Sequence, residues 1–362
     1  MFKKLFKKII FSLLTVITLL VLSELFFRIL NIKPIEIKRR EWGPRPVFRK
    51  LTPPLFGFVP GKTSHQVFFK KEEDYFVEDK IVTFRINSRG LRDSEFPLKK
   101  RRDTFRILGL GDSFTVGDGV ELNDSYLKVL EKLLNEKYPK KYHFETINTA
   151  VPGYSTLHEF YFLKDEGLSY QPDFVILGFY LNDVLPVELP GEYYEEEDGV
   201  ASLMRLHYWH RNIRPTTIYE GPFLLRLASK AFENIASYRK TKELFRVLYS
   251  KKNKRGLKQF EDSLKEIAQM TKAKNIGLLL VILPKLEMLR RYPFNNIHEF
   301  VKKISEKNQI PVLDLLPTLK KYETSSLWVH ISDHHPNEFA HKIIAEAILE
   351  EIISNKLISI KD

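Results

Sequence analysis

The sequence predicts an α/β fold, a three-layer αβα sandwich around a mostly parallel five-stranded sheet. Two observations predict it. Short apolar runs alternate with segments of helical periodicity, and these runs lack the polar alternation of a half-exposed strand. Repeated strand and helix units of this kind form parallel sheets that are buried on both sides. The 362 residues, 43% of them hydrophobic, are enough for a full core.

Five strands and their helices are expected after residue 104. The strands are predicted at 105–110, 144–148, 174–179, 276–283 and 311–315. Asn123 is predicted to cap the first helix, and Thr156 with Glu159 to form a capping box for the second. Apolar stripes predict later helices around 257–268, 297–307 and 340–352.

A membrane-spanning helix is predicted at the N-terminus. Lysines at positions 3, 4, 7 and 8 precede an uncharged run from Ile9 to Ser23. At ~1.5 Å per residue, Ile9 to Asn31 reaches ~34 Å, enough for the hydrocarbon layer. Lysines before the run favour a cytoplasmic N-terminus, and no cleavage motif follows. We expect residues 1–32 to be an uncleaved anchor that places the other residues in the periplasm; a cleaved signal peptide and a buried helix are the alternatives.

The net charge of +12 does not indicate a nucleic-acid-binding surface. Residues 1–50 hold 12 Lys or Arg against 3 acids, so most of the excess positive charge lies beside the membrane-like segment. No nucleic-acid partner is therefore expected. The absence of cysteine excludes disulfides, thiolate metal sites and a cysteine nucleophile.

Two segments precede the sheet, and one interrupts it. Residues 33–60 contain six prolines among charged residues, which predicts a stalk. Residues 61–104 carry β-type runs, above all 81–86, and predict a small β extension. Residues 185–255 exceed what the sheet needs. We interpret them as a helical cap over the active edge, a simple buttress being the alternative.

Polar residues gather where strands end. Gly-Asp-Ser at 111–113 follows the first strand, residues 148–153 follow the second, and Asn-Asp at 182–183 follows the third. A further group, 333–337, precedes the last helix. All lie at the carboxyl edge of the sheet, where open α/β folds bind ligands. Ser113, at a tight turn, is a candidate nucleophile, although alone it would be an ordinary helix-capping serine.

These four blocks resemble the SGNH hydrolases, the GDSL family of esterases and lipases, whose blocks carry Ser, Gly, Asn and His in this order. The resemblance implies that Ser113 attacks an ester carbonyl, with His335 as its base and Asp333 orienting the imidazole. It also implies that the backbone N–H groups of Ser113 and Gly153 and the side-chain amide of Asn182 bind the oxyanion.

Two positions depart from the family's pattern. The last block usually places Asp three residues before His, whereas Asp333 precedes His335 by two. Tyr180 stands where the third block often has Gly. The acyl pocket is therefore not expected to have the family's usual shape. The resemblance nevertheless covers 105–354 apart from the insertion. We expect a flavodoxin-like hydrolase domain over 105–362.

Other acidic and histidine residues near the blocks receive no catalytic role. Asp112 is expected to order the turn rather than react, and Asp314 is not expected to replace Asp333. The histidines and aspartate within 330–341 could be read as a metal cluster, but their spacing matches no standard zinc pattern. No metal and no cofactor are therefore expected.

The expected function is that of a membrane-anchored serine esterase. Its expected substrate is an acylated envelope glycan or lipid, from which it removes a short acyl group. The compartment motivates this substrate class. The alternatives are an O-acyltransferase that passes the acyl group to a polysaccharide hydroxyl and a non-catalytic envelope binding protein.

Overall fold

The computed structural model describes residues 2–30, 41–42, 48–52, 54–68, 80–139, 142–187, 238–330 and 333–358. Contacts divide the chain into two compact units. One consists of Met1–Ile37, Lys71–Tyr75 and Gly199–Arg246, and the other of Lys38–Lys70, Phe76–Asp198 and Val247–Asp362. The second unit contains the sheet and all four sequence blocks.

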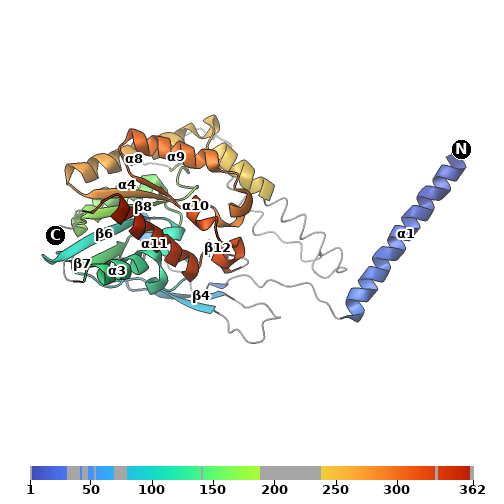
Figure 1. Ribbon diagram of the computed structural model, residues 1–362, viewed down its shortest axis with the longest axis horizontal. Coiled ribbons are helices and arrows are strands. Elements are labelled where there is room, and N and C mark those ends of the chain that lie inside the picture. Colours follow the sequence, from blue (N-terminus) through green and yellow to red (C-terminus); the bar gives the residue numbers. More distant parts are fainter. Residues whose placement is uncertain are drawn as a thin grey trace. The chain divides into compact units, whose positions relative to one another are not determined.

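The central sheet has five strands, and all four strand pairings are parallel (Figure 1). In spatial order they are β10 (Val312–Asp314), β9 (Gly277–Ile282), β8 (Phe174–Phe179), β6 (Thr104–Gly111) and β7 (His143–Asn148). This order is flavodoxin-like, with the first strand between the second and third. The predicted α/β class is confirmed, and each strand bound lies within one residue of its prediction.

Helices cover both faces of the sheet. They are α3 (Tyr126–Lys137), α4 (Thr156–Asp165), α8 (Lys254–Ala273), α9 (Asn295–Lys307) and α11 (Glu338–Ser354). Figure 1 shows α3 and α11 on one side of the strands and α4, α8 and α9 on the other. Helix α3 packs on α11, and α4 packs on α8. Every residue of β8 is buried, as expected for the middle layer of an αβα sandwich.

The start of α3 differs from its prediction. Asn123 lies within a short 3-10 turn, Leu122–Asp124, and α3 begins at Tyr126 after Ser125. Three residue types that favour helix starts follow one another here. The tertiary path of the turn, rather than cap preference, therefore decides the boundary.

The capping box of α4 is displaced by one residue. It is formed by Ser155 and His158, not by Thr156 and Glu159. The displacement turns Glu159 into the protein, where it is 0% exposed. An acidic side chain that the sequence assigned to a helix cap is thus buried.

The structure also contains short elements beside the sheet. A hairpin that the sequence did not predict, β11 (Trp328–His330) with β12 (Asp333–Pro336), precedes α11. Two single-turn helices are α2 (Ser113–Val116) and α10 (Leu316–Leu319). Short 3-10 segments lie at Gly167–Tyr170, Lys251–Asn253, Leu286–Arg291 and Thr324–Leu327.

Residues before the domain form small antiparallel sheets. Strand β4 (Thr63–Phe68) pairs with β5 (Lys80–Arg85) and with β1 (Glu41–Trp42), and β2 (Phe48–Lys50) pairs with β3 (Phe56–Phe58). Much of the described part of 33–60 is therefore stranded rather than a stalk, and Leu55 and Phe58 are buried. Pro54 and Pro60 lie on either side of β3, where they remove no ladder donor.

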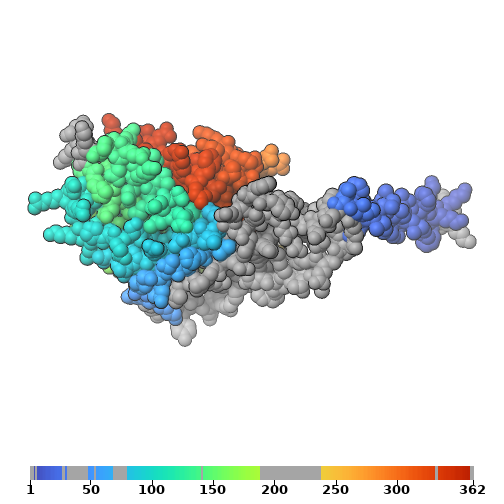
Figure 2. Space-filling view, turned by 90° about the horizontal axis from the view of Figure 1, so that it is seen from below, coloured from blue at the N-terminus to red at the C-terminus, as the bar shows by residue number. Residues whose placement is uncertain are grey.

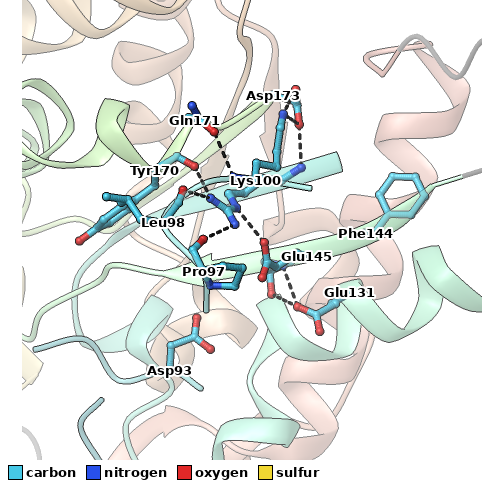
Figure 3. Close-up of polar contacts among 12 residues, drawn as sticks. Asp93, Pro97, Leu98, Lys100, Glu131, Phe144, Glu145, Tyr170, Gln171 and Asp173 are labelled. Atoms are coloured by element: carbon cyan, nitrogen blue, oxygen red, sulfur yellow. Dashed lines mark hydrogen bonds and ion pairs between the residues drawn. The ribbon is translucent and has the colours of Figure 1, made fainter. Parts of the chain in front are cut away.

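A buried guanidinium fastens this extension to the sheet. Arg106 on β6 is 0% exposed. It donates to four acceptors: the Glu145 carboxylate and the carbonyls of Pro97, Leu98 and Tyr170. Figure 3 shows these four residues around one network, with Lys100 reaching Asp173 nearby. In Figure 2 the extension, blue to cyan, runs without a break into the surface of the domain.

Helix α1 (Phe2–Ile29) is the predicted N-terminal helix. Its segment Phe6–Phe26 has a mean hydropathy of 2.4 and is long enough to cross a membrane. The hydroxyls of Thr15, Thr18 and Ser23 each donate to a carbonyl four residues earlier, which satisfies them in apolar surroundings. By length and composition, α1 could be a membrane anchor or a signal sequence.

The predicted cap, 185–255, lies largely outside the described residues, because 188–237 are not among them. The described remainder includes a helix over 238–248. The predicted apolar stripe is buried there at Leu244, Phe245 and Leu248. Its covering role stays a prediction.

Candidate active site

The turn that carries Ser113 is built by local contacts. Ser113 begins α2 directly after β6, and Asp112 caps this helix by accepting a hydrogen bond from the Phe114 N–H at 2.9 Å. Asp112 therefore orders the turn, as expected. A side chain on Gly111 would place its Cβ 2.1 Å from Thr115 Oγ1, so only glycine lets the turn close this tightly.

A chain of three polar side chains runs through Ser113. His335 Nε2 lies 2.9 Å from Ser113 Oγ, and His335 Nδ1 lies 2.5 Å from Asp333 Oδ1. The Asp333 side chain is 8% exposed and that of His335 is 24% exposed. A carboxylate, an imidazole and a hydroxyl thus lie in hydrogen-bonding sequence, the arrangement that can activate a serine hydroxyl.

The short spacing between Asp333 and His335 has a simple structural reason. Both residues lie on β12, and residues two apart in a strand project to the same side. The His335 N–H also lies 3.3 Å from Asp333 Oδ1. A spacing of two in a strand therefore brings the Asp333 carboxylate to the His335 imidazole.

Asp314 is engaged elsewhere. Its carboxylate accepts from His298 Nδ1 and Lys302 Nζ, each at 2.8 Å. Burial raises the pKa of Asp314, but His298 and Lys302 more than offset this and hold it at about 2. The expectation that Asp314 does not replace Asp333 agrees with these contacts.

The proposed oxyanion donors follow three neighbouring strands. Ser113 follows β6, Gly153 follows β7, and Asn182 follows β8. Gly153 has φ +85°, a conformation that favours glycine, and no atom lies within 4 Å of a Cβ built there. The three segments are tied together, since the Val151 N–H donates to Gly111 O and the Thr156 N–H donates to Asp183 O.

An aromatic pair lies beside the base. Tyr180, at the position where the family often has glycine, stacks on Phe114 with ring centroids 4.1 Å apart. Phe114 in turn lies 5.2 Å from the His335 ring. Tyr180 is 9% exposed and Phe114 5%, so bulky rings fill the space next to His335.

The sequence did not identify Arg92 as part of this site's support. It is fully buried and donates to the carbonyls of Val116, Gly117 and Val120 at 2.5–2.8 Å, at and beyond the end of α2. Burial lowers the pKa of Arg92 to about 10, so it stays charged at neutral pH. The spacing of these residues gave no signal, because Arg92 lies in the extension.

The sequence also gave no sign of a group of charged residues next to His335 in the chain. His334 Nδ1 lies 3.1 Å from Glu287, which pairs with Lys285 at 2.6 Å. Burial raises the pKa of Glu287, but Lys285 and His334 outweigh it and lower the pKa overall. The Trp328 ring lies 4.3 Å from that of His334. These contacts hold His334 on the side of β12 opposite His335.

The residues considered as a metal cluster have separate contacts. His334 faces Glu287, His335 faces Ser113, and His341 Nδ1 accepts from the Tyr126 N–H at 3.2 Å. Within the described ranges, no group of three or more His, Cys, Asp or Glu residues is placed to hold a metal ion.

Comparison with known proteins places this chain in a family. The model of the GDSL-like lipase/acylhydrolase family matches residues 110–343, well over half of the chain. That range contains all five residues that the sequence analysis selected. Among curated proteins, no relative matches.

Several solved structures are similar to part of this chain. A two-domain esterase active on acetylated mannans has 15% identity and a TM-score of 0.43 over 72% of this chain, which spans only 51% of that esterase. TesA has 13% identity and a TM-score of 0.41, with 70% of this chain and 99% of that one covered. An acetylxylan esterase from Geobacillus stearothermophilus has 18% identity and a TM-score of 0.43, with coverages of 68% and 94%.

Similarities this weak say nothing about the substrate of this chain. The match to the family model, in contrast, extends from the end of β6 into α11. The chain therefore belongs to the GDSL-like lipase/acylhydrolase family and is a carboxylic ester hydrolase.

Proposed function

We propose that Ser113 is the nucleophile of an esterase that hydrolyses an O-acyl ester through an acyl-enzyme. The observation that carries this proposal is the hydrogen-bonded sequence from Asp333 through His335 to Ser113. Ser113 Oγ attacks the carbonyl carbon while its proton passes to His335 Nε2. The alcohol leaves with that proton. Water then attacks the acyl-serine by the same route and releases the acid.

The remaining residues have defined roles in this proposal. Asp333 accepts the Nδ1–H of His335, fixes its tautomer and stabilises the imidazolium. The N–H groups of Ser113 and Gly153 and the Asn182 amide bind the oxyanion, where one lost donor costs about 3–4 kcal/mol of transition-state stabilisation. The open space at Gly153 supports this role, because a substrate oxygen needs it.

The substrate we propose is a short-chain ester on an envelope glycan or lipid. The rings of Phe114 and Tyr180 next to His335 favour a small acyl group. We propose that α1 anchors the chain with its N-terminal lysines in the cytoplasm, which leaves the domain in the periplasm. An acylated envelope component is the ester that this location supplies.

Active-site labelling tests the nucleophile. The full chain in detergent is treated with a fluorophosphonate probe, beside Ser113→Ala and the exposed control Ser88→Ala. We expect wild type and Ser88→Ala to be labelled and Ser113→Ala to remain unlabelled. Labelling that persists in Ser113→Ala would refute the assignment.

A second experiment separates hydrolysis from transfer. An acetyl ester is supplied with and without polysaccharide, and acetate and acetylated sugar are measured. We expect acetate in both cases. If product forms only when sugar is present, the chain is an O-acyltransferase and the hydrolase proposal is wrong.

A further inference from the structure

Three carboxyl groups are buried in the segments around the proposed oxyanion donors. Asp112 and Glu159 are 0% exposed and Asp183 is 1% exposed. Each belongs to a segment that carries a site residue or leads from one: Asp112 precedes Ser113, Glu159 lies in the first turn of α4 after the Gly153 loop, and Asp183 follows Asn182.

These carboxyl groups lack enough donors. Asp112 Oδ1 accepts from the Phe114 N–H, and Asp183 Oδ2 accepts from the Tyr180 N–H at 3.0 Å. Asp112 Oδ2, Asp183 Oδ1 and both oxygens of Glu159 are buried without a hydrogen bond of good geometry, although the Asn182 side chain lies near Asp112 and the Thr156 side chain near Glu159. Among the described residues, no Lys, Arg or His forms an ion pair with any of the three. Buried oxygens without donors are costly unless a proton on one of them supplies the missing bond.

Each of these carboxyl groups has other acidic groups near it. Burial raises the pKa of Asp112 to about 6, and burial together with Asp112 raises that of Glu159. Burial, Glu159 and Asp112 raise the pKa of Asp183. The other titratable groups that interact with the cluster are Tyr126, Tyr154, Tyr249, Asp118 and, as the one base, His335.

We propose that Glu159 is a positioning residue, a carboxylic acid that stays neutral and shares its proton with Asp112 or Asp183 behind the oxyanion-binding groups. The inference rests on the proposed roles of Ser113 and Asn182. The positive end of the α4 dipole favours an ionised Glu159. Its partial charge is, however, too small to offset the free-energy cost of desolvating a buried carboxylate.

A neutral Glu159 has a clear consequence for the reaction. The transition state gains negative charge on the oxyanion, so another buried charge behind Asn182 would oppose it. Asn182 lies beside Asp112, and its amide lowers the pKa of that carboxyl. If Glu159 shares its proton with one oxygen of Asp112 or Asp183, Asp112 still has an oxygen that can accept from the Asn182 amide and orient it. The other amide N–H can then face the oxyanion.

The kinetic test compares kcat from pH 6 to pH 10 for the full chain, Glu159→Gln and Glu159→Leu. Gln is neutral and can donate, so we expect its kcat at pH 7 to stay within about threefold of wild type. Leu leaves the acceptors unpaired and should lose about tenfold or more. At alkaline pH, wild type should lose activity as the shared proton leaves, whereas Glu159→Gln should not. A Gln variant as impaired as Leu at pH 7 would mean that an ionised Glu159 is required.

The second measurement needs no esterase activity, so failure of the proposed function and failure of this inference can be told apart. It is made in the Ser113→Ala background. A folded Glu159 that keeps its proton stabilises the fold below its unfolded pKa, and this stability is lost as the pH rises. Urea unfolding should therefore show Glu159→Gln gaining stability over its parent as pH rises above about 4.5. The carboxylic-acid infrared band should weaken in that variant at neutral pH.

Glu166→Gln, at the C-terminal end of the same helix, is the matched control. It should change neither the alkaline limb of the kcat profile nor the infrared band. Parallel stability curves for Glu159→Gln and its parent, with an unchanged infrared band, would overturn the inference even if Ser113 is labelled normally.

Discussion

Single residues at this site are placed by backbone conformation as much as by side-chain type. Asp333 and His335 share one side of β12 because the strand is extended, and Gly153 takes a left-handed conformation that other residues adopt at a cost. Asp314 has equal chemistry to Asp333 but lies against His298. Position therefore decides which of these two carboxylates lies against His335.

Asp333→Asn should keep the fold but lower kcat by about 10³- to 10⁴-fold, because the amide cannot hold the imidazole in the productive tautomer. Steady-state kinetics and a thermal melt measure this. Asp314→Asn is the control, which should change stability and leave kcat within about twofold. Near-normal turnover of Asp333→Asn would place the orienting group elsewhere.

Asn182→Ala should lower kcat by about 10²- to 10³-fold with little change in KM, because the lost donor acts mainly on the oxyanion. Asn308→Ala, at the end of α9, should leave both constants unchanged. The contradicting result is a rise in KM at constant kcat, which would make Asn182 a ground-state binding residue.

At the scale of elements, the extension supports the turn that carries Ser113. Arg92 donates hydrogen bonds to backbone carbonyls at the end of α2. Gln66 on β4 accepts from the Gly119 N–H at 2.9 Å. Asp93 accepts from the Asn148 N–H at 2.7 Å. Two of the four blocks are thus held by residues that precede the first strand of the sheet.

Arg92→Lys should destabilise the protein by about 3 kcal/mol or more, because an ammonium cannot match the fork that bonds three carbonyls. Urea unfolding measures this change. Arg85→Lys, an exposed change on β5, should stay within about 0.5 kcal/mol. Equal stability of the two variants would mean that the extension does not secure α2.

At the scale of the whole molecule, two buried histidines make folding sensitive to acid. Burial lowers the pKa of His158 to about 4 and that of His341 to about 3. Both stay neutral in the fold, whereas in the unfolded chain they bind protons below about pH 6.5. Stability from these residues is therefore present above pH 6.5 and is lost as the pH falls toward 4.

His341→Gln should reduce the loss of unfolding free energy between pH 7 and pH 5, because Gln does not titrate and can still accept from the Tyr126 N–H. Chemical denaturation at a series of pH values checks this. His65→Gln, at an exposed position, should leave the slope unchanged. The same slope in all three proteins would contradict the role of His341.

Local information in the sequence determined much of this protein. Apolar runs and helical stripes fixed the five strands and the main helices, because burial on two faces requires such patterns. Ordered blocks at strand ends predicted that Ser113 and His335 lie at one edge of the sheet, and the two side chains are 2.9 Å apart.

Tertiary structure decided the rest, because those contacts join segments far apart in the chain. Hairpin β11–β12 gave Asp333 its direction toward His335, and the capping box at Ser155 turned Glu159 into the core. Arg92 reached α2 from 24 residues away. No local period encodes such contacts. They depend on how buried polar groups find partners once the layers have packed.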